Sequence, residues 1–447
     1  MLTASILSFP AGSPGAQAAE NIAGALAASY RGNPVLQAER ARQRATDEQV
    51  PQALSGWRPT VVTDADGGAE WSKTKPGGSS DTNPAGVTIS LSQPIFNGFR
   101  TVSDTKRAEA TVAAGRQNLL QIEQQVLLDA ATAFMNVLRD REIVRLRERN
   151  VAVLREQLRA SRVRFDVGEI TKTDVEQSRA RLSLSEADLA VARSNSQASA
   201  AFFVRVIGHA PGNLTYPRLS PRAPKSVQSA IAMAERVNPQ ILAAAFNAEA
   251  ARHNIDLVES QLYPQVSLEA NYSLNREPSS SIRRAEQGAI FGQISIPLYQ
   301  GGLISSQVRE AKQTASQLRI TILASSRDVR EAVVSSWYIL NAAGQTITSF
   351  RAQVSANQLA LEGVRQEAQV GTRTTLDVLD AEQELVNSQV SLVSAQRDQI
   401  VAGYQLIASV GRMTARDLGL SVEYYDSEDN YRNVRNKLWG IKADTLD

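Results

Sequence analysis

The sequence predicts a mainly helical, internally duplicated protomer whose small β-sheet is completed only when copies of the chain meet. Three observations predict this fold class. Motifs recur in the same order about 203 residues apart, pairs of segments alternate in hydrophobicity, and apolar residues repeat every seven positions over 130–165 and 333–368. A sustained seven-residue spacing indicates long helices that pack lengthwise, and alternation indicates strands with one apolar face.

The duplication is visible in four pairs of markers. Two pairs are 205 residues apart, namely Asn33-Pro34 with Asn238-Pro239 and Pro59 with Pro264. Two later pairs are 203 residues apart. They are "QPIFNGFR" (93–100) with "IPLYQGGL" (296–303) and "VGEITKTDVEQSRARL" (167–182) with "VGTRTTLDVLDAEQEL" (370–385). Ordered markers with one small shift indicate two copies of a single structural unit. We therefore expect a first repeat over 19–220, a second over 221–420, and a polar C-terminal tail over 421–447.

Each repeat contains a predicted pair of strands, over about 58–95 and about 263–297. The clearest strand, "QVSLEANYSLN", places Val266, Leu268 and Tyr272 on one face and polar residues on the other, and Val87 and Ile89 alternate in the same way in the first repeat. Period-two alternation over about ten residues is typical of a strand with one apolar face. The intervening runs "KPGGSSDTNP" and "REPSSSIRRAEQG" are polar and rich in turn formers, so we expect loops there.

Two long helices are expected over 101–167 and 304–370, which contain neither proline nor a cluster of turn formers. The heptad positions are Ala130, Val137, Val144, Val151, Leu158 and Phe165, with Val333, Leu340, Ile347, Val354, Leu361 and Ala368 as their equivalents. Taken alone, this spacing also suits a soluble coiled coil. A periplasmic coiled-coil adaptor or structural protein is therefore the alternative hypothesis.

The strands favour a membrane channel over that alternative. Four strands cannot close a barrel, because the smallest barrels need about eight, and an open sheet with an apolar face must be paired or covered. Three chains with four strands each would close a twelve-stranded β-barrel, and the helices that continue from the strands would extend it as an α-helical barrel. No stretch reaches about 18 apolar residues, which predicts no transmembrane helix, but barrel strands escape such a count.

The composition argues against several function classes. The net charge of +2 is made of interspersed signs, which gives no basic face for nucleic acid. The chain has no cysteine, so we expect neither disulfides nor thiolate metal sites, and no lipid anchor on an N-terminal cysteine. His209 and His253 are isolated, so we expect no metal site, no Ser-His-Asp triad and no cofactor. We expect a transport protein rather than an enzyme.

The pattern of the N-terminal segment is typical of an export signal. An apolar run over 2–9 precedes Ala16-Gln17-Ala18, which matches the small-x-small pattern of a secretory cleavage site. We therefore interpret residues 1–18 as a signal peptide.

The two bends, near residues 168 and 371, share one short sequence pattern. A glycine suits the left-handed position after a helix, a threonine suits the cap of the next helix, and an aspartate three residues later suits a shortened capping box. The residues are Gly168, Thr171 and Asp174 in the first bend and Gly371, Thr374 and Asp377 in the second. Arg373 and Asp380 need a further explanation, because the first repeat has Ile170 and Gln177 at those positions.

The duplicated order of elements, the run "QPIFNGFR" and above all "VGTRTTLDVLDAEQEL" resemble the TolC family of outer-membrane channel proteins, over about residues 20–420. The resemblance implies a homotrimer in outer-membrane lipid, with its helical barrel in the periplasm. It also implies docking onto a periplasmic adaptor (membrane fusion) protein and an inner-membrane transporter of the resistance-nodulation-division or ATP-binding-cassette type. Such channels are the exit ducts of efflux pumps and type I secretion systems, and the cargo stays open between drugs, toxic compounds and proteins.

The resemblance also implies roles at the bends. Arg373 corresponds to the gate arginine of the family, and Asp377 and Asp380 correspond to its acidic constriction rings. Thr173 and Asp174 correspond to positions that the gate network engages on the other hairpin. The bend residues Gly168, Thr171, Gly371 and Thr374 are candidates for adaptor docking. The sequence departs from the family at Ala368, where a gate tyrosine is expected.

Overall fold

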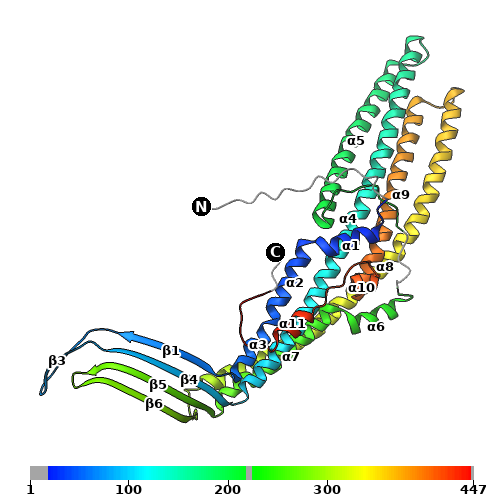
Figure 1. Ribbon diagram of the computed structural model, residues 1–447. Coiled ribbons are helices and arrows are strands. Elements are labelled where there is room, and N and C mark those ends of the chain that lie inside the picture. Colours follow the sequence, from blue (N-terminus) through cyan, green and yellow to red (C-terminus); the bar gives the residue numbers. More distant parts are fainter. Residues whose placement is uncertain (1–18, 218–223, 444–447) are drawn as a thin grey trace. The chain divides into compact units, whose positions relative to one another are not determined.

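The computed structural model describes residues 19–217 and 224–443, and most of them are helical (Figure 1). The proposed signal peptide over 1–18 lies outside the described residues. The chain forms two compact units, and each unit draws on both halves of the sequence. One contains residues up to 39, 120–238 and 327–425, and the other contains 40–119, 239–326 and the chain from 426 onward. Within 19–217 and 224–443, no helix combines the length and the hydropathy needed to span a bilayer.

A four-stranded antiparallel sheet joins the two repeats at its centre (Figure 1). Its order is β1 (Thr60–Gly67), β4 (Ala85–Asn97), β5 (Gln265–Ser279) and β6 (Ile282–Ser295). Val87 is opposite Leu274 and Ile89 is opposite Tyr272. Because opposite residues share a face, the apolar sets predicted separately in the two repeats lie on one continuous face.

The predicted polar loops are only partly loops. The run over 75–84 contains the turn that follows β2 (Glu70–Thr74) and the whole of β3 (Gly78–Thr82), and these two strands pair as a separate two-stranded sheet. The run over 276–288 is mostly strand, because β5 continues to Ser279 and β6 starts at Ile282. The loop expectation is therefore wrong for most of the second run and for residues 78–82 of the first, whereas residues 75–77 form a turn and 83–84 lie outside the strands. Backbone pairing does not require apolar side chains where both faces are exposed, so the ladder extends beyond the alternating part.

The two helical hairpins have matching lengths. In the first, α4 (Arg100–Asp166, 67 residues) is followed by α5 (Lys172–Ile207, 36 residues). In the second, α8 (Leu303–Gln369, 67 residues) is followed by α9 (Thr375–Val410, 36 residues). Both long helices begin and end within one residue of the predicted ranges. At about 1.5 Å per residue, each is on the order of 100 Å long.

The heptad stripe of the long helices is partly buried within the protomer. Ala130, Val137 and Val333 are fully or almost fully buried, whereas Phe165, at the end of the stripe, is 41% exposed. The stripe therefore packs within the chain over most of α4 and leaves apolar surface near the first bend.

Shorter helices flank the hairpins. They are α1 (Ile22–Gly32), α2 (Pro34–Asp47), α3 (Gln49–Leu54), α6 (Val227–Val237), α7 (Pro239–Glu259), α10 (Ala415–Leu418) and α11 (Asp429–Val434). The two Asn-Pro markers lie at equivalent helix junctions. The amide nitrogen Nδ2 of Asn33 donates to the carbonyl of Val206 (2.9 Å), and Nδ2 of Asn238 donates to the carbonyl of Ser409 (2.8 Å). The duplication thus extends to individual hydrogen bonds.

The C-terminal tail contributes to a core. Val50, Ala53, Ala108 and Val112 form a buried cluster, and Tyr431 of α11 packs against it. The segment predicted only as a polar tail therefore includes an apolar contact.

Candidate gate at the hairpin bends

Both bends stop the long helix with the same backbone motif. Gly168 has φ 78°, its N–H donates to the carbonyl of Phe165 (2.9 Å), and the N–H of Glu169 donates to that of Arg164 (2.8 Å). Gly371 has φ 84°, and the N–H of Thr372 donates to the carbonyl of Glu367 (3.0 Å). These are Schellman motifs, which favour glycine at the left-handed position.

Both following helices begin with a capping box. The Asp174 N–H donates to Oγ1 of Thr171 (3.3 Å), and the Thr171 N–H donates to Oδ2 of Asp174 (2.9 Å). Thr374 and Asp377 repeat this exchange at 3.2 Å and 2.9 Å. The capping roles expected for these four residues are present in the structure.

The capping contacts shift the acidity of both aspartates. The hydroxyl and the backbone N–H of Thr171 hold the pKa of Asp174 below its usual value. The backbone N–H and hydroxyl of Thr374 do the same for the pKa of Asp377, and Arg373 adds to the effect. Donors and positive charge favour the ionised carboxylate, so both groups stay ionised to a lower pH than an ordinary aspartate.

The ion pairs beside the bends differ between the repeats. In the first bend Arg164 pairs with Glu169 (2.7 Å). In the second bend the acidic residue is on the helix, and Glu367 pairs with Arg373 (2.8 Å). This contact raises the pKa of Arg373. Within the protomer, the predicted gate arginine therefore lies against its own hairpin.

Asp380 is paired with the other hairpin. Nη2 of Arg181, on α5, donates to Oδ1 of Asp380, on α9. The neighbouring pair of Arg365 and Glu382 joins α8 to α9 inside the second hairpin. Two aspartates that the sequence places on one helix face thus have different partners, because Asp377 caps its own helix while Asp380 bridges the hairpins.

Arg181 was missed from the sequence alone. The repeat comparison carries a signal for it, since the equivalent position in the second repeat is Glu384, so the charge is reversed. Thr173 is exposed in the first turn of α5, and Ala368 is partly buried near the end of α8. Engagement of Thr173 and Asp174 by Arg373 stays a prediction for the assembled protein.

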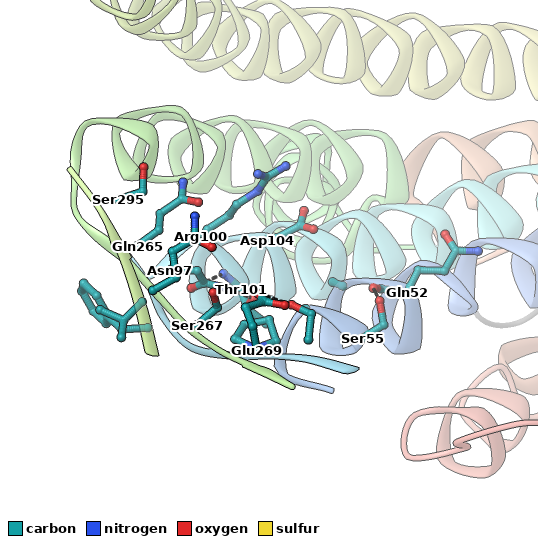
Figure 2. Close-up of a pocket in the computed structure, with 17 residues that line it drawn as sticks. Gln52, Ser55, Asn97, Arg100, Thr101, Asp104, Gln265, Ser267, Glu269 and Ser295 are labelled. Atoms are coloured by element: carbon teal, nitrogen blue, oxygen red, sulfur yellow. Dashed lines mark hydrogen bonds between the residues drawn. The ribbon is translucent and has the colours of Figure 1, made fainter. Parts of the chain in front are cut away.

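A second polar feature lies where the sheet meets α4 (Figure 2). A cavity of about 520 Å³ is lined by Glu269 of β5 and by Arg100 and Asp104 of α4, among others. Oγ of Ser92 donates to Glu269 (2.8 Å). The face of the sheet opposite the apolar one is therefore polar and hydrogen-bonded.

Comparison with known proteins decides the family. The sequence profile of the outer membrane efflux protein family matches residues 27–209 and again residues 230–412. This chain belongs to the outer membrane efflux protein family. The double match agrees with the internal duplication, and the localisation of the family is the outer membrane.

Curated relatives of this outer membrane efflux protein cover most of its length. It is 38% identical to the outer membrane efflux protein BepC of Brucella suis biovar 1 (strain 1330), over 95% of this chain and 92% of BepC. It is 27% identical to the outer membrane protein TolC of Escherichia coli (strain K12), over 90% of this chain and 84% of TolC. The predicted resemblance to the TolC family is confirmed, which decides against the coiled-coil adaptor hypothesis.

Solved structures share the fold. The CmeC outer membrane channel of Campylobacter jejuni has a TM-score of 0.80 at 14% identity, covering 93% of this chain and 89% of that one. VceC of Vibrio cholerae has a TM-score of 0.73 at 20% identity, covering 87% and 96%. The outer membrane efflux protein is thus an outer-membrane channel protein in fold and family, and this family consists of channels rather than enzymes.

Proposed function

We propose that three copies of this outer membrane efflux protein form the exit duct of a tripartite efflux pump. The duct takes drugs and other toxic compounds from an inner-membrane transporter through a periplasmic adaptor. The transporter is of the resistance-nodulation-division or ATP-binding-cassette type. The cargo leaves through a twelve-stranded β-barrel in the outer membrane.

The observation that carries the proposal is the sheet with two open edges. In the part of the chain that the structure describes, β1 pairs only with β4 and β6 pairs only with β5. Ile290, on the apolar face of β6, is 76% exposed. Unpaired strand edges are unfavourable in lipid, where every backbone polar group needs a partner. Pairing β6 of one copy with β1 of the next satisfies both edges, and three copies supply enough strands for closure.

The bends form the periplasmic entrance in this proposal. Arg373, Asp377 and Asp380 come from the second hairpin, and Thr173 and Asp174 from the first. Each exposed ion pair contributes about 0.2–1 kcal/mol. Threefold repetition adds several such terms, which suffices to hold a closed state that a partner can still open. The glycines and threonines of the bends, Gly168, Thr171, Gly371 and Thr374, are the proposed contact points for the adaptor.

Efflux is favoured over protein secretion by the relatives. The efflux protein BepC is 38% identical over 95% of this chain, whereas the alkaline protease secretion protein AprF of Pseudomonas aeruginosa is 22% identical over 74%. Type I secretion of proteins is therefore the second candidate function.

One deletion strain tests both candidates. Loss of the protein is expected to increase susceptibility to bile salts and dyes and to leave the secreted proteome intact. A loss of secreted proteins with unchanged susceptibility would instead support secretion.

Mass measurement of the purified protein in detergent is expected to give a trimer, and a stable monomer would contradict the duct.

A further inference from the structure

We propose that Arg181 is a gate residue that latches the first hairpin to the second through Asp380 of the same protomer. The inference rests on the proposed duct and its entrance, and adds a residue that no part of the gate assignment above contains. It also gives Asp380 a different role from Asp377.

The geometry separates this ion pair from its neighbours. Arg181 and Asp380 are 199 residues apart and join α5 to α9. Nearby charges are paired locally, since Arg179 pairs with Glu176 three residues away (2.8 Å) and Arg373 pairs with Glu367. Near the bends, the Arg181–Asp380 pair therefore ties one hairpin to the other, whereas its charged neighbours stabilise single hairpins.

The pair has two consequences for an entrance built from three copies. First, separation of the hairpins requires breaking one such contact in each protomer, which opposes opening. Second, a guanidinium held against each Asp380 offsets the negative charge of that ring. Block by polyvalent cations is then weaker than two uncompensated carboxylate rings would give.

Neutralising Arg181 tests both consequences. In planar bilayers, Arg181→Gln is expected to raise the open-to-closed ratio by about threefold to a hundredfold. This range corresponds to the loss of three exposed ion pairs, one in each protomer. The same variant is expected to strengthen block by a polyvalent cation such as hexamminecobalt, because Asp380 loses its partner. Unchanged gating would overturn the latch.

Arg179→Gln is the matched control. It removes the same charge two residues away on the same helix, and its partner Glu176 lies on its own helix. It should leave conductance near the wild-type value. An effect equal to that of Arg181→Gln would show that the loss of one positive charge, rather than the contact with Asp380, changes the gating. The swapped variant Arg181→Asp/Asp380→Arg is expected to restore closure.

Crosslinking tests whether the pair lies within one protomer. The chain has no cysteine, so Arg181→Cys/Asp380→Cys carries only the two introduced thiols. A short bismaleimide is expected to produce a monomer of altered mobility in denaturing gels, and crosslinked dimers or trimers would overturn the within-protomer latch. Absence of any channel from the wild-type protein would refute the duct itself, whereas a wild-type channel with an inert Arg181→Gln would refute the latch alone.

Discussion

Two equivalent glycines have the same backbone angle but different surroundings. Gly98 and Gly301 both have φ 64°. A Cβ on Gly98 would lie 2.5 Å from the carbonyl oxygen of Ser260 and 2.8 Å from Cβ of Tyr263, whereas a Cβ on Gly301 meets nothing within 4 Å. Backbone strain is common to both positions, and steric overlap is confined to Gly98.

We therefore predict that Gly98→Ala destabilises the protein far more than Gly301→Ala. Gly301→Ala is expected to lower the free energy of unfolding by about 1–2 kcal/mol, because of the left-handed backbone alone. Gly98→Ala has this cost as well, and in addition its Cβ pushes against the carbonyl oxygen of Ser260. Thermal unfolding in detergent, followed by circular dichroism, measures the difference between the two midpoints. Equal midpoints would show that the contact at Ser260 relaxes freely.

The capping aspartates predict a pH dependence of the bends. The folded pKa of Asp174 lies below its unfolded value, so its stabilising effect is present above about pH 4 and is lost as the pH falls through the folded pKa. Hydrogen exchange at the start of α5 is expected to accelerate in that acid range. Asp174→Asn should flatten this dependence, and an unchanged profile in that variant would assign it to other groups.

The gate assignment predicts a different measurable effect for each of two residues. Arg373→Ser removes a proposed closing contact and is expected to raise conductance in planar bilayers. Asp380→Ala removes a carboxylate from its ring and is expected to weaken block by polyvalent cations. Wild-type conductance in the first variant, or wild-type block in the second, would remove that residue from the entrance.

Among the secondary-structure elements, α11 has the clearest energetic role. Tyr431 packs on the cluster of Val50 and its neighbours. Nδ2 of Asn430 donates to Oδ2 of the fully buried Asp47 (2.8 Å), and Arg435 pairs with Glu109 (3.0 Å). These contacts join the segment after residue 425 to α2 and to the start of α4.

Removing residues 426–447 is predicted to lower thermal stability and to expose α2 and α3 to proteolysis. It uncovers apolar surface and takes a hydrogen-bond donor from a buried carboxylate, which costs about 1–3 kcal/mol for that group alone. Truncation after Lys437 is the control, because it keeps α11 and all three contacts. Indistinguishable stability of the two truncated proteins would contradict a structural role for α11.

The sequence predicted regular elements well and long-range partners poorly. The absence of proline and turn formers placed both long helices within one residue, and the glycine, threonine and aspartate at each bend placed the caps, because these signals are local. The strands in the polar runs over 75–84 and 276–288 were missed, since their pairing depends on the neighbouring strand rather than on side-chain hydrophobicity. Arg181 was missed for the same reason, because its partner is 199 residues away.

In the whole molecule, neither repeat contains the centre of the sheet. β4 of the first repeat pairs with β5 of the second from Ala85–Arg276 to Asn97–Gln265. We predict that residues 1–220 expressed alone form no sheet-containing trimer, because β4 then lacks its central partner. Co-expression with residues 221–447 is expected to restore the sheet-containing trimer. Assembly of the isolated half would show that β4 finds another partner.

The distance along the chain between these central strands has a consequence for biogenesis. Ser92 and Glu269, which meet in the finished sheet, are 177 residues apart. At about 5–20 residues per second of synthesis, β4 waits roughly ten to thirty-five seconds for β5 to emerge. During that interval the edge of β4 that pairs with β5 in the finished sheet has no strand beside it, so the nascent chain carries an open hydrogen-bonding edge until the second repeat has been made.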